Sequence, residues 1–257
     1  MPRAGIIVVG EVESTQSEAR RRLAAGQQAP LWIMARRQRA GRGRKGREWF
    51  SQEGNLALSA LLIEDAPRAH LPQLSFVAAL AAHKALRALA GRRGRADIAD
   101  ALRLKWPNDI LLGDEKLGGI LLESEARSGR GGSLVIIGWG MNLAGHPEHV
   151  RWPATSLAAH GLTLDAQDLA GYVQDSFARW HDLWRARGFA PVRAAWQRRA
   201  WGLGERLSVN TGKALLSGIF RELGEDGALM LETANGKVYA LHAGEVERTM
   251  PGGTGEI

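Results

Sequence analysis

The chain of 257 residues contains no cysteine. Disulfide bonds, thiolate zinc sites and cysteine nucleophiles are therefore excluded as sources of stability or chemistry. A protein without disulfides fits the reducing interior of a cell, so we expect a cytoplasmic location.

Long apolar runs are missing as well. The N-terminal run at residues 6–9 is too short for a signal peptide. The most apolar long stretch, residues 71–90, is interrupted by His83, Lys84 and Arg87, so no segment is expected to span a membrane. Hydrophobic residues make up 45% and charged residues 24% of the chain, which is typical of a globular protein with a sizeable core.

Lysine is scarce, because six lysines and 28 arginines make up the 34 cationic side chains. The net charge is +7 and the isoelectric point is about 10.3, values that favour acidic or phosphorylated partners. Arginine is scattered along the whole chain, however, and a biased composition alone would give the same excess. The charge therefore indicates an anionic partner without identifying it.

The pattern of apolar residues predicts an α/β (α+β) fold in which a mixed sheet is backed by helices. Ser14 is a suitable N-cap for the first helix. Strand-like runs occupy residues 5–10, 31–35, 56–63, 102–105, 110–112, 117–122 and 134–137. Helical patterns occupy residues 15–25, 70–89, 164–187 and 189–199.

The apolar runs become shorter and are separated by turn sequences after about Gly202, which predicts a second domain. Beyond it, four short strand-like runs are separated by turn sequences, at residues 207–209, 215–220, 228–231 and 238–241. This pattern is typical of a small β-barrel. We expect a larger domain at residues 1–201, an SH3-like barrel at residues 202–250 and a disordered tail at residues 251–257.

The segment AGRGRKGREWFS, residues 40–51, carries four cations and three glycines, and Trp49 and Phe50 follow them. Glycine lets backbone N–H groups approach an anion closely, and arginine binds phosphate or carboxylate in a bidentate manner. The segment is not a Walker loop, because the order GxxxxGK[ST] is absent. A phosphate-binding loop, an RNA-binding arm and a solvated linker all remain open.

Three further clusters combine rigid turns or glycines with polar side chains. In KWPND, Pro107 restricts the turn that presents Asn108 and Asp109. These two side chains either bind a nucleotide hydroxyl or hydrated Mg²⁺ or belong to an ordinary Asn-Asp turn. In KLGGILLE, Lys116 either bridges two anionic reactants or lies exposed at a hairpin. In GWGMN, Asn142 follows a glycine-containing strand and either binds a ligand or ends the strand.

Taken together and in this order, GRGRKGREW, KWPNDI, KLGGILLE and GWGMN resemble the signature segments of biotin protein ligases, which attach biotin to carboxylases. EVESTQ at residues 11–16 and ATSL at residues 154–157 resemble further segments of that family. The resemblance covers about residues 5–160, and the small β-rich C-terminal part is similar too. Each motif alone is unspecific, whereas the joint pattern is highly specific.

The resemblance implies a catalytic domain similar to class II aminoacyl-tRNA synthetases and a two-step reaction with ATP, Mg²⁺ and biotin. First, the biotin carboxylate attacks the α-phosphate of ATP and yields biotinyl-5′-AMP and pyrophosphate. Then a lysine of the biotin carboxyl carrier protein attacks the mixed anhydride and releases AMP. Fixed cations and Mg²⁺ would stabilise the charge that develops at the α-phosphate.

The resemblance also implies roles for individual residues. The implied catalytic residues are Lys116, Arg44 and Asp109. The implied biotin-binding residues are Ser14, Thr15, Gln16, Gln38, Arg42, Gly43, Arg44, Trp49, Lys116 and Gly119. The implied ATP-binding residues are Arg42, Arg44, Arg47, Asn108, Lys116 and Asn142. Asp109 would hold Mg²⁺ or help to deprotonate the incoming lysine, and the sequence does not separate these two roles.

Two positions depart from the family pattern. Gln16 stands where an asparagine is usual, which puts that one contact in doubt. Trp139 is bulkier than the small or aliphatic residue expected between the two glycines, so its side chain either enters the core or reshapes the pocket.

Regulatory members of the family carry an N-terminal helix-turn-helix domain. Because the first expected strand begins at Gly5, we expect no such domain here, and therefore no sequence-specific DNA binding. We also expect no membrane partner, and a homodimer is one candidate for the oligomeric state.

The arginine-rich loop is expected to move. Its glycines and like charges favour disorder, and nothing in its composition holds it down before a ligand binds. We expect residues 37–47 to close over biotin and the adenylate and to protect the mixed anhydride from water.

Two rival functions fit part of the pattern. Lipoate ligases share the fold and an analogous adenylation, but their glycine-rich segment ends in an apolar residue and a His-Asp pair, whereas this one ends in Glu48 and Trp49. A nucleic-acid-binding module would explain the basic isoelectric point and would bind oligonucleotides in a salt-dependent manner.

Overall fold

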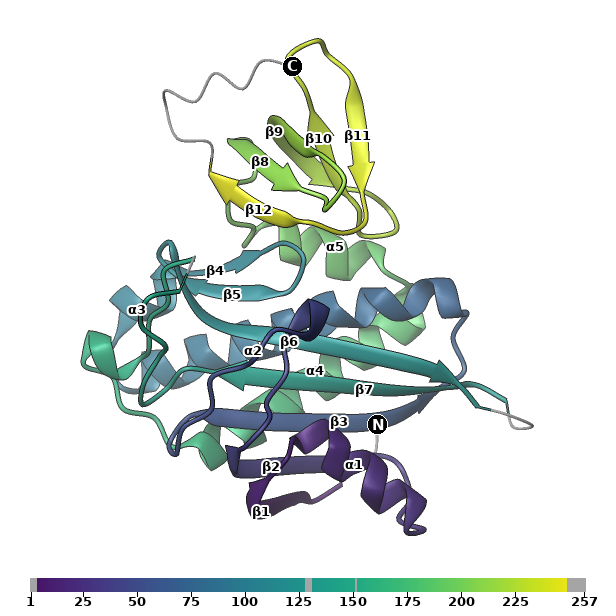
Figure 1. Ribbon diagram of the computed structural model, residues 1–257, viewed down its shortest axis with the longest axis vertical. Coiled ribbons are helices and arrows are strands. Elements are labelled where there is room, and N and C mark those ends of the chain that lie inside the picture. Colours follow the sequence, from purple (N-terminus) through teal and green to yellow (C-terminus); the bar gives the residue numbers. More distant parts are fainter. Residues whose placement is uncertain (1–3, 128–130, 151, 249–257) are drawn as a thin grey trace.

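The computed structural model of this chain describes residues 4–127, 131–150 and 152–248. Within these ranges the chain forms a seven-stranded sheet and a five-stranded sheet, the latter built from the C-terminal residues (Figure 1). This arrangement confirms the expected α/β class with a small β-rich C-terminal part. The expected tail at residues 251–257 lies outside the described residues.

The large sheet has the strand order β1-β2-β3-β7-β6-β5-β4. Strands β1 and β2 are parallel, and every other neighbouring pair is antiparallel, so the sheet is mixed as expected. These seven expected strand-like runs are confirmed, although β2, β6 and β7 are longer than expected. Their bounds are β1 Ile6–Val12, β2 Leu31–Gln38, β3 Leu56–Glu64, β4 Leu102–Lys105, β5 Asp109–Leu112, β6 Glu115–Ala126 and β7 Ser133–Met141.

Helices cover both faces of this sheet. Helices α2 (Leu74–Arg92) and α4 (Ala166–Arg187) pack together on one face, and α1 (Thr15–Ala24) lies on the other (Figure 1). The short helices are α3 Ala96–Ala101, α5 Ala190–Gln197 and the 3₁₀ helices η1 Arg44–Gly46, η2 Arg68–Gln73 and η3 Ala158–His160. The four predicted helices are confirmed, and α3 was not predicted.

One helix start differs from the prediction. The sequence pattern placed the long helix from residue 70, but α2 begins at Leu74, after the separate helix η2. Pro72 lies inside η2. A proline lacks the N–H donor of a regular helix and its ring crowds the preceding turn, so the two helical segments do not merge.

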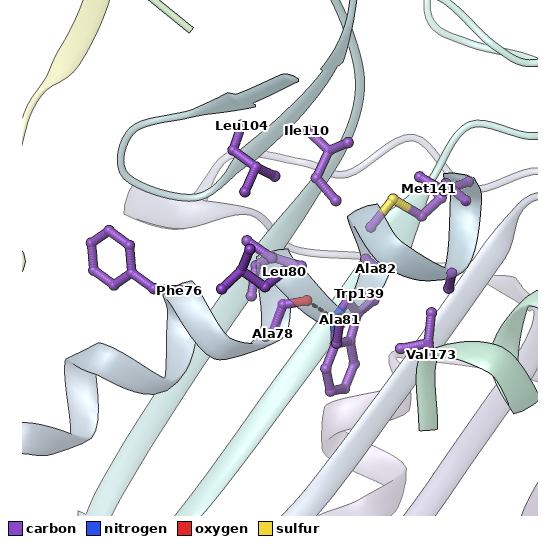
Figure 2. Packing of buried hydrophobic residues seen from close by; sticks show 14 of the residues in the cluster. Phe76, Ala78, Leu80, Ala81, Ala82, Leu104, Ile110, Trp139, Met141 and Val173 are labelled. Atoms are coloured by element: carbon purple, nitrogen blue, oxygen red, sulfur yellow. Dashed lines mark hydrogen bonds between the residues drawn. The ribbon is translucent and has the colours of Figure 1, made fainter. Parts of the chain in front are cut away.

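The core lies between the large sheet and helices α2 and α4. Trp139 of β7 points into it, stacks on Trp32 with the ring centroids 5.5 Å apart, and donates from its indole N–H to the carbonyl of Ala78 on α2 (Figure 2). The side chain of Trp139 therefore enters the core, which is one of the two outcomes expected for this departure from the family pattern.

The segment Arg68–Arg92 is long and apolar enough to cross a membrane by length and composition alone, with a mean hydropathy of 1.2 in its most apolar window. Of that window, 72% is buried inside the fold. The apolar character of this segment is therefore explained by its place in the core.

The C-terminal sheet is antiparallel, with the order β11-β10-β9-β8-β12. It packs against the first part of the chain, where the indole N–H of Trp106 donates to the carbonyl of Gly227 at 3.0 Å. Its strands are β8 Arg206–Asn210, β9 Leu215–Leu223, β10 Leu229–Glu232, β11 Val238–Leu241 and β12 Glu245–Arg248. Strand β12 was not predicted, because three of its four residues are charged and only Val246 is buried. A domain boundary near residue 202 stays a prediction.

Candidate active site

A cleft of about 320 Å³ opens on the face of the large sheet that carries α1. Its floor comes from strands β3, β6 and β7, and its walls come from the start of α1, the loop after β2 and the loop after β7. Every site residue that the sequence predicted lines this one cleft: Ser14, Thr15, Gln16, Gln38, Arg42, Gly43, Arg44, Arg47, Trp49, Asn108, Asp109, Lys116, Gly119 and Asn142.

The start of α1 brings buried hydroxyl groups to one end of the cleft. Ser14 caps the helix, because its Oγ accepts a hydrogen bond from the N–H of Ser17 at 3.1 Å. Thr15 lies with its Oγ1 2.7 Å from the Oγ of Ser59 on β3. The Oε1 of Gln38 accepts from both the N–H and the hydroxyl of Thr15, at 2.8 and 3.1 Å. This end is therefore polar and already organised by internal hydrogen bonds.

Gln16 crosses the cleft floor from α1 to the sheet. Its Nε2 donates to the carbonyl of Leu121 on β6 at 3.1 Å. A Cβ at Gly138 would lie only 3.1 Å from this Nε2, so the glycine gives the amide its room. The longer side chain, which replaces the usual asparagine of the family, thus reaches β6 directly.

The arginine-rich loop forms a compact turn rather than an extended arm. The N–H of Gly43 donates to the carbonyl of Arg47 at 2.7 Å, and the N–H of Trp49 donates to the carbonyl of Gly41 at 2.8 Å. Lys45 in its centre adopts the left-handed conformation, with φ of 58°. The loop therefore folds back on itself beside the cleft.

Acidic residues from distant strands contact this loop. Glu245 of β12 lies 3.7 Å from the Nζ of Lys45 and 3.3 Å from Nη1 of Arg47. Glu123 of β6 lies 3.8 Å from Nη2 of Arg42. The loop therefore has partners in parts of the chain that its own composition cannot reveal, and the expectation that residues 37–47 move before a ligand binds stays a prediction.

Arg44, in contrast, points into the cleft. Its Nη1 donates to Oδ1 of Asn108 at 3.2 Å. Burial lowers the pKa of Arg44, and the nearby Asp109 carboxylate opposes this shift. Asn108 is itself fixed, since its Nδ2 donates to the carbonyl of Ile120 at 2.6 Å. The guanidinium is thus a cation removed from bulk water and held by the KWPND turn.

Lys116 stands near the middle of the cleft. Its Nζ lies 2.7 Å from Oδ1 of Asp109 and 5.7 Å from the ring centroid of Trp49. Its backbone N–H donates to the carbonyl of Pro153 at 2.8 Å, which fixes the start of β6 against the loop after β7. The ammonium is only partly exposed, at 27% of the side chain. It is therefore accessible to a ligand from the cleft.

Trp49 closes the cleft over β7. A Cβ at Gly140 would overlap the indole ring of Trp49, so only glycine permits this close approach. The alternation of side chains along β7 puts Trp139 on the opposite face. The GWG sequence thus supplies core packing on one face and the space for an aromatic wall on the other.

Asn142 carries a polar atom without a partner. Its Nδ2 donates to the carbonyl of Thr155 at 3.0 Å. Its Oδ1 is buried and has no hydrogen-bond partner among the described residues. Because buried polar atoms are normally paired, this acceptor suits a donor group of a ligand in the cleft.

Sequence reasoning missed Asn55, which organises the loop after Asn142. Its Oδ1 accepts from three successive N–H groups, those of Leu143, Ala144 and Gly145, at 2.9, 2.9 and 3.1 Å. Its Nδ2 donates to the carbonyl of Gly145 at 2.8 Å. Gly54-Asn55 reads as a turn before a strand, so nothing in the sequence distinguishes this amide.

Other lining residues were not singled out from the sequence: Leu58 and Ser59 on β3, Ile120 and Leu121 on β6, and Pro147, Val150 and Trp152 after β7. The last three form what we call the apolar end of the cleft. An apolar and aromatic wall of this kind accepts a planar ring. The cleft thus has a hydroxyl-rich end, a cationic middle and an apolar end.

Comparisons with known proteins give a consistent result. The model of the family described as biotin/lipoate A/B protein ligases matches residues 9–142. The biotin--[acetyl-CoA-carboxylase] ligase of Paracoccus denitrificans is 40% identical over 245 residues, which cover 93% of this chain and 98% of that protein.

Two solved structures extend the likeness to nearly the whole chain. The biotin protein ligase of Aquifex aeolicus in complex with biotin and ATP gives a TM-score of 0.78 at 28% identity, over 95% of this chain and 99% of that chain. The biotin protein ligase of Leishmania major in complex with biotinyl-5-AMP gives a TM-score of 0.65 at 27% identity, over 94% of this chain and 100% of that chain.

Proposed function

The chain belongs to the biotin/lipoate A/B protein ligase family, and we propose that it is an ATP-dependent biotin protein ligase. It activates biotin to biotinyl-5′-AMP and transfers the biotin to a lysine of the biotin carboxyl carrier protein of acetyl-CoA carboxylase or a related carboxylase. The observation that carries this proposal is that Lys116 lies in one cleft together with buried hydroxyl groups and an apolar end. The ligase names of close relatives support it.

In the first step, an oxygen of the biotin carboxylate forms a bond to the α-phosphorus of ATP. The bond from that phosphorus to the bridging oxygen of the β-phosphate breaks, and pyrophosphate leaves with the electron pair. Both reactants are anions, so cations must stand where they meet. Lys116 and Arg44 supply two such charges beside the KWPND turn, where they contact Asp109 and Asn108, and both are partly removed from solvent.

Biotin fits the end formed by α1. Its urea group needs hydrogen-bond donors and acceptors, and Ser14, Thr15 and Gln38 offer them on a buried, preorganised frame. Its apolar rings need a flat wall, which Trp49 provides above Gly140. In this orientation the carboxylate of biotin points to Lys116. Gln16, Arg42, Gly43 and Gly119 complete the proposed biotin site.

The nucleotide fits the remaining part of the cleft. Arg42, Arg44 and Arg47 would contact the phosphates, and Asn108 would contact a polar group of the nucleotide. The free Oδ1 of Asn142 would accept a hydrogen bond from the sugar or the base. The adenine ring would lie in the apolar end.

Mg²⁺ fits this cleft with help from the substrate. Among the residues that the structure describes, no group of three or more His, Cys, Asp or Glu is placed to hold a metal ion. In nucleotide sites Mg²⁺ is usually held by one or two carboxylates together with substrate phosphates. Asp109 supplies one carboxylate, so we propose that it and the phosphates would hold the ion. When bound, Mg²⁺ would neutralise charge on the α-phosphate and on the leaving pyrophosphate.

In the second step, the neutral amine of the acceptor lysine attacks the acyl carbon of biotinyl-5′-AMP. An amide bond forms, the acyl–oxygen bond of the anhydride breaks, and AMP leaves as the amine loses its proton. Asp109 is a candidate acceptor for that proton. The Asp109→Asn variant separates this role from Mg²⁺ binding. If the variant no longer transfers biotin from added biotinyl-5′-AMP, the carboxylate takes the proton of the acceptor lysine. If it loses only the adenylation step, the carboxylate holds the ion.

Biotin-dependent exchange of labelled pyrophosphate into ATP tests the proposed function, because it reports the first step without an acceptor protein. We expect exchange with biotin and little with lipoate. Lipoate-dependent exchange without a biotin response would replace the proposal by the lipoate alternative, and sequence-selective DNA binding at physiological salt would favour a nucleic-acid function. The homodimer stays a candidate for the oligomeric state, and the expected cytoplasmic location stays a prediction.

A further inference from the structure

Lys105 opens the KWPND motif, and the proposed reaction gives it no task. The residue is 6% exposed, at the end of β4. Its Nζ lies 2.9 Å from the ring centroid of Trp152 and 5.7 Å from that of Trp201. A buried ammonium needs a compensating partner, and here indole faces supply one.

The charge on Lys105 has a second source of compensation. Burial lowers the pKa of Lys105 to about 8. The Asp109 carboxylate opposes this shift, the ammonium of Lys116 adds to it, and Glu247 and Glu245 oppose it more weakly. At pH 7 the group is therefore mostly an ammonium ion.

Trp152 separates Lys105 from the cleft. The indole lines the cleft, whereas Lys105 is not among the described residues that do so. The ring is oriented by its N–H, which donates to the carbonyl of Asp114 at 3.1 Å, and by an edge-to-face contact with Trp201 at 5.4 Å. The ammonium therefore lies behind the wall that the cleft presents.

A cation behind an aromatic ring acts on the opposite face of that ring. It attracts the electron density of the indole, because the face of the ring is the negative part of its quadrupole. An electron-rich purine then meets a less repulsive surface when it stacks from the cleft side. The same contact limits rotation of the side chain, so the wall is formed before the nucleotide arrives.

We propose that Lys105 is a positioning residue for the nucleotide, an inference that rests on the proposed function. It holds Trp152 as the surface on which the base of ATP stacks. Biotin lies at the other end of the cleft and does not contact this wall. Lys105 therefore sets the affinity for ATP and leaves that for biotin unchanged.

The test uses Lys105→Met, which keeps most of the length of the side chain and removes the charge, and Lys105→Arg, which restores a cation. Lys84→Met is the control, because Lys84 is an exposed lysine on α2. Pyrophosphate exchange is measured at pH 7 with each substrate varied in turn. We expect Lys105→Met to raise the KM for ATP about tenfold, with the KM for biotin and kcat within about twofold of wild type. Lys105→Arg recovers most of this loss.

Several results would overturn the proposal: an unchanged KM for ATP, an equal rise in both KM values, or no recovery with Lys105→Arg. If Lys105→Met does not fold, the Trp152→Leu variant carries the test. It should raise the KM for ATP alone, and adding Lys105→Arg to it should have no further effect. An independent effect of that second substitution contradicts the coupling between the two residues.

A failure of the proposed function can be distinguished from a failure of the role proposed for Lys105. Wild-type protein without biotin-dependent exchange would refute the ligase activity. Titration of wild type and Lys105→Met with a non-hydrolysable ATP analogue would then still decide the role of Lys105, since it needs no turnover.

Discussion

The Nζ of Lys116 lies 2.7 Å from Oδ1 of Asp109, and the two side chains come from neighbouring strands β6 and β5. Both are partly buried, with 27% and 19% of the side chain exposed. The carboxylate fixes the direction of the ammonium before any substrate binds. A cation prepared in this way costs little reorganisation when the two anionic reactants meet beside it.

Replacing Lys116 should therefore remove most of the adenylation activity without unfolding the protein. We expect Lys116→Ala to slow biotin-dependent pyrophosphate exchange on the order of 10²-fold or more, because a charged contact to the transition state is lost. Lys84→Ala removes the same charge at an exposed position of α2 and should leave the rate unchanged. A rate for Lys116→Ala within about threefold of wild type would remove this residue from the mechanism.

Gly140 should be required for biotin affinity. The Gly140→Ala substitution places a Cβ where the indole of Trp49 now lies, so the aromatic wall must move. We expect the KM for biotin to rise about tenfold or more, by analogy with the cost of a misplaced contact in a preorganised site. Gly10→Ala is the matched control, because a Cβ at Gly10 meets nothing within 4 Å. Equal KM values for the two variants would contradict the proposed wall.

The stability of the protein should fall in mild acid because of His83. Burial lowers the pKa of this histidine to about 3, and nearby Arg199 adds to the shift. The unfolded chain, in which the pKa of a histidine is about 6.5, takes up a proton that the folded chain refuses. Between these two pKa values each unit of decreasing pH therefore costs about 1.4 kcal/mol of unfolding free energy.

The His83→Gln variant isolates this effect, because glutamine does not titrate. Urea unfolding of both proteins at about pH 7.5 and pH 5 should show that wild type loses ~2 kcal/mol more than the variant on acidification. The other titrating groups are common to both proteins and cancel. Equal losses would show that His83 is accessible to protons in the folded state.

Much of the fold was predictable from local patterns. The seven strands of the large sheet alternate or run apolar over lengths typical of strands, and the long helices have clear apolar periodicity. The misses have local causes. Strand β12 has a single buried residue, Val246, and α3 spans only six residues. Neither leaves a periodic signal.

The site was predictable to the extent that its residues lie in motifs. Their gathering in one cleft follows from the sheet, since β5, β6 and β7 are neighbours. Asn55 and Glu245 were not predicted, because their importance comes from tertiary contacts. Asn55 binds the loop after β7, and Glu245 contacts the arginine-rich loop from the second sheet. A single sequence contains no sign of such pairings.

Glu245 of β12 contacts two cations of the arginine-rich loop. Lys45 and Arg47 lie 3.7 and 3.3 Å from this carboxylate, so Glu245→Gln should free the loop. Limited trypsin digestion should cut residues 36–47 of the ligand-free variant severalfold faster than in wild type. Biotin with a non-hydrolysable ATP analogue should slow the cut in both proteins, because the ligands add contacts that do not depend on Glu245.

Glu222→Gln, at an exposed position of β9, is the control and should be digested at the same rate as wild type. If Glu245→Gln and wild type are cut at the same rate, the ion pairs do not hold the loop. If ligands leave the rate unchanged, the loop does not close over them.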